Sequence, residues 1–174
     1  MPASRPGLGA LLDADRARLR AQMSQVQPRA EWLLLHPGFV AVALFRLAER
    51  CDAAGWHRIA RLLAALNHGL TGADLHPASR AGPGLLIPLP EAVRFEASCG
   101  RDCTLHPQSA VGPWHRLAPG RPVLGDGVEV GFGALLLGPI SVGDGAVIGP
   151  RCLIEQDVPA GASALSLPVR ARGP

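Results

Sequence analysis

Small and branched apolar residues recur every six positions through the second half of this chain. The repeat starts at Leu75, is interrupted once after Val111, and continues to Ile154. Its members are Leu75, Ala81, Ile87, Val93, Cys99, Leu105, Val111, Leu124, Val130, Leu136, Val142, Ile148 and Ile154. An α-helix repeats about every 3.6 residues and a half-buried strand every two, so this spacing predicts a parallel β-helix of hexapeptide repeats. The alternative, an all-β sandwich, would alternate with period two between its turns.

Two further places in each hexad fit such a solenoid. The second place is often glycine, at Gly82, Gly100, Gly112, Gly125, Gly131, Gly143 and Gly149. The fifth place is often small, at Ser79, Ala97, Cys103, Ser109, Ala134, Ala146 and Cys152. Each hexad is expected to form one short strand and a corner, and three hexads form a triangular coil. We expect the branched and small residues to point inward, and glycine to accept corner backbone angles that other residues resist. No coil can bury its own face, so stability comes from stacking.

The repeat is interrupted between Val111 and Leu124, which lie thirteen positions apart. A loop at about 112–123 is therefore expected to leave the solenoid. It contains Trp114, His115 and Arg121. A loop of this composition on a rigid scaffold is either a ligand-contacting element or a tolerated insertion.

The first part of the chain, residues 1–72, has the apolar spacing of α-helices. Ile59, Leu62, Leu66 and Leu70 would share one face of a helix that stops at Gly72. A further segment rich in Arg and Ala, residues 11–23, is expected to be a helix that lies exposed or packs on a partner subunit. The predicted fold class is α+β, with a helical region over 1–72, a β-helix over 73–165 and a C-terminal tail over 166–174.

Composition narrows the classes of partner. Seventeen cationic and fourteen acidic residues give a net charge of +3, with no basic stripe carrying interleaved aromatic residues, so nucleic-acid binding is not expected. The longest apolar run, residues 39–45, is too short to span a bilayer, and no membrane partner is expected. The start of the chain is rich in Pro and Gly and lacks the apolar stretch of a signal peptide, which predicts a cytoplasmic protein.

The four cysteines, Cys51, Cys99, Cys103 and Cys152, form no CxxC pair. Cys99 and Cys103 could be half of a metal site, but no second pair and no histidine at ligand spacing accompanies them. We expect free cysteines packed in the core and no bound metal.

Several segments resemble serine O-acetyltransferases, a family of hexapeptide-repeat acyltransferases. The similarity covers residues 31–170. Its most specific part is the junction Thr71-Gly72-Ala73-Asp74-Leu75-His76-Pro77-Ala78, which precedes the first hexads. The same family pattern continues over residues 82–87, 124–128, 137–140, 142–146 and 157–162.

The resemblance implies a left-handed β-helix that forms a homotrimer, with active sites between neighbouring solenoids. In many members the helical part joins two trimers, so a dimer of trimers stays open. The implied reaction moves an acetyl group from acetyl-CoA to the hydroxyl of serine, with a carboxylate-paired histidine as the base. Asp74 occupies the place of the family's substrate-binding Asp, and a capping role between helix and solenoid is the alternative.

The sequence departs from the family pattern at the places where its chemistry is expected. The Asp-His pair that contains the family's general base is Pro88-Leu89 here. The histidine of a second motif is replaced by Arg121, and the segment near the CoA site reads Ser166-Leu167-Pro168-Val169-Arg170. The longer tail ending in Ile, through which many members dock on cysteine synthase, is missing, so that docking is not expected.

The candidate site residues follow from these comparisons. His115 in the loop and His106 at a corner are the candidate bases, and a structural corner is the alternative for His106. Asp74 and Arg121 are the candidate substrate contacts, with a solvated loop arginine as the alternative for Arg121. The residues expected at the acetyl-CoA site are Phe132, Gly133, Arg151, Ser166 and Arg170. Glu91, at a place that prefers small residues, either turns outward or has a function.

Two functions are compatible with this sequence. The first is an acyltransferase of serine acetyltransferase type, which moves an acetyl or other acyl group from CoA to the hydroxyl or amine of a small, amino-acid-like acceptor. The second is a catalytically inactive scaffold or regulatory subunit that retains the trimer. The loss of both family histidines favours the second, whereas Asp74 and the His115 loop favour the first. We expect the enzyme.

Overall fold

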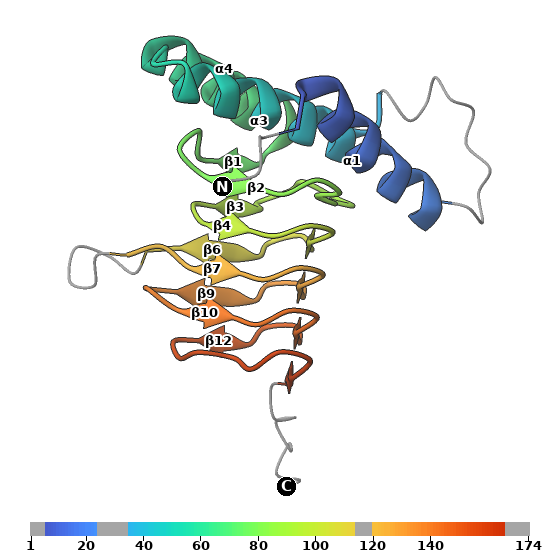
Figure 1. The fold of residues 1–174 in the computed structure, drawn as a ribbon, viewed down its shortest axis with the longest axis vertical. Coiled ribbons are helices and arrows are strands. Elements are labelled where there is room, and N and C mark those ends of the chain that lie inside the picture. Colours follow the sequence, from blue (N-terminus) through green and yellow to red (C-terminus); the bar gives the residue numbers. More distant parts are fainter. Residues whose placement is uncertain (1–5, 24–34, 114–119, 166–174) are drawn as a thin grey trace, which may run out of the picture.

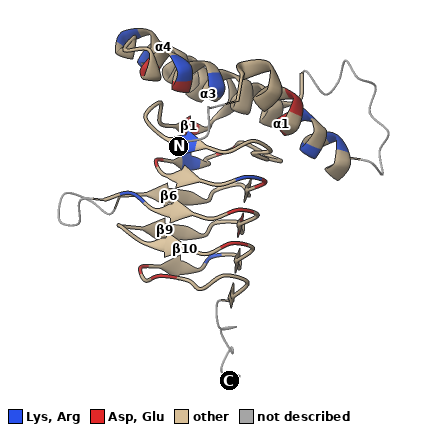
Figure 2. Ribbon diagram, viewed as in Figure 1, with Lys and Arg blue, Asp and Glu red and all other residues tan. Residues whose placement is uncertain are grey.

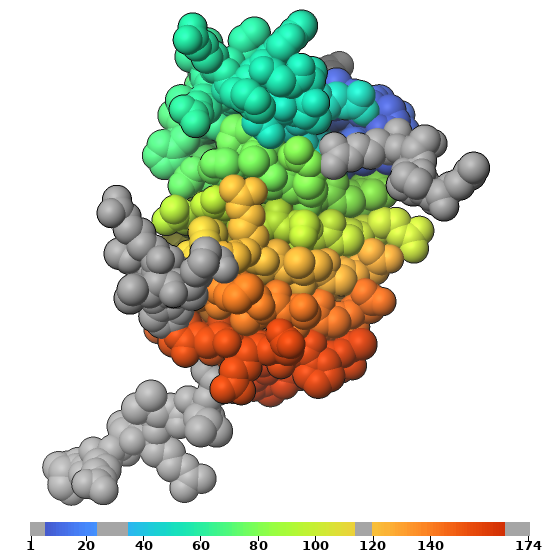
Figure 3. Space-filling model, turned by 60° about the vertical axis from the view of Figure 1, so that its left-hand side comes forward, coloured from blue at the N-terminus to red at the C-terminus, as the bar shows by residue number. Residues whose placement is uncertain are grey.

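The computed structural model describes residues 6–23, 35–113 and 120–165 and consists of helices above a triangular solenoid (Figure 1). The helices are α1 (Leu8–Gln22), α3 (Pro37–Ala53) and α4 (His57–Thr71). Helices α3 and α4 are consecutive and pack on each other, and α1 packs on α3. In the space-filling view, bands of successive colour show the coils stacked beneath the helices (Figure 3).

Short parallel strands form three faces, which we call A, B and C. Face A contains β1 (Asp74–Leu75), β3 (Arg94–Phe95), β6 (Ala110–Gly112), β9 (Leu135–Leu137) and β12 (Leu153–Ile154). Face B contains β2 (Arg80–Ala81), β4 (Ser98–Cys99), β7 (Val123–Leu124) and β10 (Ser141–Val142). Face C contains β5 (Thr104–Leu105), β8 (Glu129–Val130), β11 (Val147–Ile148) and β13 (Ser163–Ala164). The chain visits A, B and C in turn, so coil 1 begins at β1, coil 2 at β3, coil 3 at β6, coil 4 at β9 and coil 5 at β12.

The predicted period holds except around Phe95. Val93 is buried in the core, as expected, but the place in register with Leu75 and Val111 belongs to Phe95. Leu75 and Val111 both pair with Phe95. Leu86 pairs with Thr104, which places Ile87 above Leu105. Eight positions then separate Ile87 from Phe95, and four separate Phe95 from Cys99. The two irregular corners cancel and restore the phase at Cys99, which is why the six-residue count runs through them unbroken.

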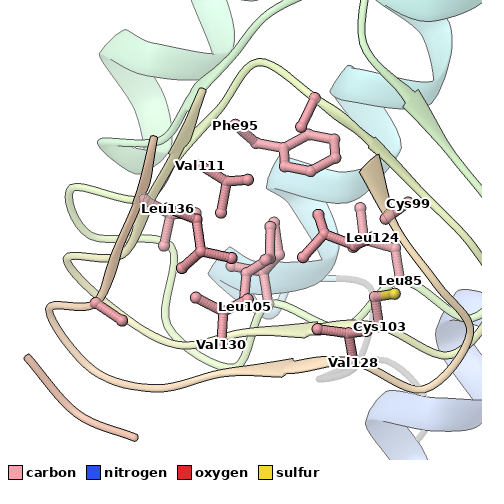
Figure 4. Close-up of a cluster of buried hydrophobic side chains, with 14 of the residues drawn as sticks. Leu85, Phe95, Cys99, Cys103, Leu105, Val111, Leu124, Val128, Val130 and Leu136 are labelled. Carbon is pink, nitrogen blue, oxygen red and sulfur yellow. The ribbon is translucent and has the colours of Figure 1, made fainter. Parts of the chain in front are cut away.

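Inward side chains from all three faces form one core (Figure 4). Phe95, Leu105, Val111, Val130 and Leu136 are each completely buried. Phe45 of α3 meets Phe95 edge to face, with ring centroids 6.1 Å apart. Such aromatic contacts favour an edge-to-face geometry, and this one continues the solenoid core into the helices.

The repeated glycines are needed for a reason other than the expected one. No glycine at the second place of a hexad has positive φ. A Cβ at Gly82 would instead lie 2.5 Å from the carbonyl carbon of Gly100, and one at Gly131 would lie 2.6 Å from the Ile148 oxygen. The close approach of stacked backbones therefore excludes a side chain at these two places. Positive φ occurs two residues later, for example at Gly133.

A buried ion pair ties the helices to coil 1. The Arg46 guanidinium of α3 donates to both oxygens of Asp15 at 2.9 and 3.0 Å, and to the carbonyls of Ala81 and Gly82 at 2.5 and 2.6 Å. Asp15 in turn accepts from the backbone amides of Gly84 and Leu85, both at 2.8 Å. Helix α1 is thus held by its own chain, so the expectation that it lies exposed is wrong, whereas packing on a partner subunit stays a prediction. Two residues 31 positions apart make this contact.

Helix α4 has the predicted amphipathic pattern, but its apolar face points away from the molecule. Ile59, Leu62, Leu66 and Leu70 are 47%, 70%, 49% and 65% exposed. The buried side of α4 consists of Ala60, Asn67 and Thr71. Asn67 donates to the carbonyl of Ala41 in α3, so polar contacts help to hold this side.

Aspartates connect successive B–C turns, where acidic residues follow one another on the right-hand side of Figure 2. Asp144 accepts from the Asp126 amide at 2.8 Å, and Asp126 accepts from the Arg101 amide at 2.8 Å. The Arg101 guanidinium also pairs with Asp126 at 3.2 Å. The backbone hydrogen bond from Arg101, followed by its side-chain bond, lowers the pKa of Asp126 below its ordinary value.

Replacing Asp126 with Asn is expected to make stability less sensitive to acid. A carboxylate whose folded pKa is lowered stabilises the fold above its unfolded pKa, and this contribution is lost as the pH falls through the folded value. Wild-type protein should therefore lose more of its Tm than Asp126→Asn between about pH 5 and about pH 3. Thermal unfolding followed by circular dichroism at both pH values measures this difference. Equal losses in the two proteins would contradict the assignment.

Candidate active site

The turns that lead from face C to face A stack on one another and form an edge of the solenoid. The Gly133 amide donates to Pro107 at 3.0 Å, and the Arg151 amide donates to Phe132 at 2.8 Å. Consecutive coils therefore place His106, then Phe132 and Gly133, then Arg151 along this line. We call it the C–A edge and include Glu129, which precedes the turn of coil 3.

His106 and Glu129 form a histidine–carboxylate pair on the C–A edge. The Nε2 atom of His106 lies 2.9 Å from Oε1 of Glu129. The histidine side chain is 29% exposed and that of the glutamate 50% exposed. Thr104 pairs in register with Glu129, so the carboxylate belongs to the coil below the histidine. The pair is therefore accessible from solvent.

Three residues expected at the acetyl-CoA site lie on the same edge. Phe132 is 39% exposed. Gly133 has a φ of 65°, and a Cβ there would lie 3.4 Å from Cγ of Arg151. Arg151 is exposed and has a φ of 57°, an unusual angle for a residue with a side chain. Ser166 and Arg170 lie outside the described residues.

The corner above His106 carries the residues that replace the family's Asp-His pair. Pairing of Leu86 with Thr104 places Pro88 above His106. Leu89 is 50% exposed, and neither side chain can accept a proton. Glu91 is exposed, so of the two alternatives for this residue the structure shows the outward one.

The two predicted substrate contacts are Asp74, which lies on face A, and Arg121, which lies beside it. Nη2 of Arg121 lies 2.9 Å from Oε1 of Glu96, and Nη1 donates to the Ala78 carbonyl at 3.2 Å. Arg121 thus spans coils 1 to 3 at the corner where coil 2 is short. Asp74 is exposed on face A, with its carboxylate 3.7 Å from Nε of Arg94.

The junction between α4 and β1 uses another residue for the capping role considered for Asp74. Thr71 donates to the Asn67 carbonyl at 2.8 Å, and its Oγ1 accepts from the Ala73 amide at 3.3 Å. Gly72 ends α4 with a φ of 76°. Asp74 begins β1 and faces Arg94 across the next coil. A role in substrate binding stays a prediction for Asp74.

Sequence reasoning missed Glu129 and could not describe His115, which lies outside the described residues. The sequence signal for Glu129 was its place before the inward Val130, which turns its side chain outward. Its pairing with His106 could not be predicted without the register of the strands before and after the loop at 112–123. Cys99, Cys103 and Cys152 are buried and free, as predicted, and Cys51 is free and partly buried. A hydrogen bond with Cys103, together with burial, raises the pKa of Cys99.

Within residues 6–23, 35–113 and 120–165, no group of three or more His, Cys, Asp or Glu side chains could hold a metal ion. No helix in the same part of the chain has the length and apolar character needed to cross a membrane.

Comparison with known proteins identifies relatives that are serine acetyltransferases. No family model matches the chain. Serine acetyltransferase of Helicobacter pylori is 32% identical over 160 residues, which cover 89% of this chain and 94% of that protein. Serine acetyltransferase of Mycobacterium tuberculosis is 32% identical over 164 residues, covering 91% and 72%.

Solved structures agree with these relatives. Soybean serine acetyltransferase complexed with serine superposes with a TM-score of 0.86 at 29% identity, over 97% of this chain and 70% of that one. The Neisseria gonorrhoeae enzyme in complex with serine gives a TM-score of 0.81 at 26% identity, over 94% and 68%. The predicted fold class, a helical region followed by a left-handed β-helix of hexapeptide repeats, is confirmed. The relatives and the shared fold together place this chain in the serine acetyltransferase family.

Proposed function

We propose that this protein moves an acetyl group from acetyl-CoA to the hydroxyl of serine, or to the hydroxyl or amine of a similar small amino-acid-like acceptor. The observation that carries this proposal is the C–A edge, where His106 and its carboxylate partner share one line of turns with Phe132, Gly133 and Arg151. The H. pylori relative, which this chain matches over almost its whole length, supports the acceptor.

The edge offers contacts suited to each part of acetyl-CoA. Arg151 would supply charge-assisted hydrogen bonds to phosphate oxygens. Gly133 lets a ligand approach the backbone without a side chain in the way, and the exposed ring of Phe132 offers apolar contact to the pantetheine arm. Ser166 and Arg170 are proposed to extend this site from residues outside the described part.

Asp74 and Arg121 are proposed to bind the acceptor. The Asp74 carboxylate suits an ammonium group, and the Arg121 guanidinium suits a carboxylate. Glu96 and the Ala78 carbonyl orient Arg121 through two of its nitrogens. A guanidinium has five N–H donors, so this orientation is compatible with a further carboxylate contact.

The chemistry requires a base that removes the acceptor proton while the acceptor attacks the thioester. Pro88 and Leu89 cannot serve, so the base must come from elsewhere, and His106 and His115 are the proposed candidates. The presence of Pro88 and Leu89 favours the second function, an inactive scaffold or regulatory subunit. The His106–Glu129 pair is the observation against it.

We further propose a cytoplasmic homotrimer with active sites between neighbouring solenoids, because the C–A edge and the Arg121 corner lie on different edges of one chain. The exposed apolar face of α4 supports pairing of two trimers through the helices. Docking on cysteine synthase is not proposed.

Purified protein is expected to bind acetyl-CoA and to release CoA thiol when serine or a related acceptor is added. Isothermal titration calorimetry measures binding, and a thiol reagent measures turnover over a panel of small alcohols and amines. Arg151→Gln should raise the Kd for acetyl-CoA about tenfold, equivalent to about 1.4 kcal/mol. Arg101→Gln removes an arginine from the B–C turns and should leave the Kd unchanged. Absence of binding at about 1 mM acetyl-CoA would remove the acyltransferase function.

A further inference from the structure

We infer that His106 is the general base of the transfer and that Glu129 is its positioning residue. This inference rests on the proposed function and specifies which atom accepts the proton. His106 is one of two candidates named above, whereas Glu129 enters only through the folded structure. The argument depends on the two ring nitrogens of His106 and on their different surroundings.

Glu129 fixes one ring nitrogen of His106. A carboxylate 2.9 Å from Nε2 favours the tautomer that carries the proton on that atom. The lone pair then lies on Nδ1, which becomes the proton acceptor. The backbone of His106 is also held, because its amide donates to Val130 at 3.0 Å and its carbonyl accepts from Oγ of Ser109 at 2.6 Å.

A second histidine in the same kind of turn shows why Nδ1 of His106 is available. His76 is also followed by proline, and its Nδ1 accepts from the Ala78 amide at 3.1 Å. The equivalent amide after His106 belongs to Gln108 and donates to the Glu91 carbonyl at 3.0 Å instead. The lengthened corner of coil 1 places Glu91 there. The amide that bonds to Nδ1 in the His76 turn therefore bonds to Glu91 in the His106 turn, which leaves Nδ1 of His106 without this donor.

Position favours a catalytic role over a structural one. The His106 turn donates and accepts backbone bonds with the turn of Phe132 and Gly133 in the coil below, where the pantetheine arm is proposed to bind. A similar pair, His57 and Asp52, also has a 2.9 Å separation but lies where α3 meets α4. His57 and Asp52 thus provide a control, a histidine–carboxylate pair with the same separation away from the C–A edge.

The step balances without an oxidant or a metal. Nδ1 of His106 takes the proton of the acceptor hydroxyl, and the hydroxyl oxygen forms a bond to the thioester carbonyl carbon. The carbon–sulfur bond breaks, and the imidazolium returns the proton to the departing thiolate. The products are the O-acetyl acceptor and free CoA. Glu129 stabilises the imidazolium during the transfer.

Three substitutions on the C–A edge and one control away from it test the inference. His106→Gln keeps a side chain that can bond to Glu129, and it should lower kcat for thiol release by at least about a hundredfold. The Kd for acetyl-CoA should stay within about twofold of the wild-type value. Glu129→Gln should lower kcat about tenfold with KM unchanged, and Glu129→Asp should restore part of that loss. His57→Gln should leave kcat, KM and Tm at wild-type values.

The outcomes distinguish failure of the inference about His106 from failure of the proposed function. Wild-type protein without thiol release towards any acceptor would overturn the proposed function and the inference together. Turnover that survives His106→Gln, or that is removed by His115→Ala and not by His106→Gln, would overturn the inference alone. Thermal unfolding of each variant checks its fold, and His106→Asn replaces His106→Gln if the latter is unfolded. Loss of kcat in the folded variant supports His106.

Discussion

Replacing Arg46 with alanine is expected to lower the free energy of unfolding by about 3–5 kcal/mol, the range found when one partner of a buried ion pair is removed. The side chains of Arg46 and Asp15 are 0% and 1% exposed. Removal of the guanidinium leaves the Asp15 carboxylate buried without its cation, and it leaves the Ala81 and Gly82 carbonyls without their donors. Chemical denaturation followed by circular dichroism measures the loss.

Arg50 provides the control for this substitution. It lies one turn later on α3, is exposed and donates to the Pro6 carbonyl. Arg50→Ala should change stability by no more than about 0.5 kcal/mol. Because Arg46 and Asp15 belong to one network, Arg46→Ala combined with Asp15→Ala should cost less than the sum of the two single changes. Equal effects of Arg46→Ala and Arg50→Ala would show that the pair does not anchor the helices.

Gly143→Ala is the second substitution with a large expected effect, a loss of about 3 kcal/mol from overpacking. A Cβ at this position would lie 2.6 Å from Cα of Ala160 and 2.9 Å from the carbonyl carbon of Pro159. Both atoms are backbone of the next coil, so relief requires that the two coils separate. Measurement of Tm and of the denaturation midpoint tests this result.

Gly69→Ala is the matched control. Gly69 lies in α4, and a Cβ there would have no neighbour within 4 Å. Alanine favours a helix over glycine by up to about 1 kcal/mol, so this variant should be as stable as wild type or more stable. A similar loss in both variants would contradict the stacking explanation. The contrast separates close approach of the coils from any general intolerance of alanine.

The sequence predicted the solenoid because its period reflects a contact made in every coil. It could not predict the shift at Phe95, because the long corner at the end of coil 1 and the short corner of coil 2 together keep the count of twelve between Ile87 and Cys99. The role of the second-place glycines was assigned to backbone angles, since one hexad gives no information on the distance to the next. That distance is set by the stacking of one coil on the next.

The candidate site was partly predictable for the same reason. His106, Phe132, Gly133 and Arg151 occupy equivalent turns, and their common edge follows from the repeat once the register is known. The link between His106 and Glu129 crosses the interruption at 112–123, whose contribution to the coil cannot be counted from the sequence. The contact between Asp15 and Arg46 has no periodic signal at all, because it joins two helices through side chains.

The compensating corners at the end of coil 1 and in coil 2 affect how residues can be matched between relatives. An alignment that follows the hexad pattern passes through residues 87–99 without a gap and assigns Val93 to the inward place that Phe95 holds. Within this stretch, any residue role transferred by counting hexads is displaced by two positions, and Arg94 and Glu96 lie in it. From Cys99 to Val111, and again from Leu124 to Ile154, the same alignment is in register. Insertions and deletions in such a solenoid are therefore best matched over a whole coil, because a gain at one corner can be cancelled at the next.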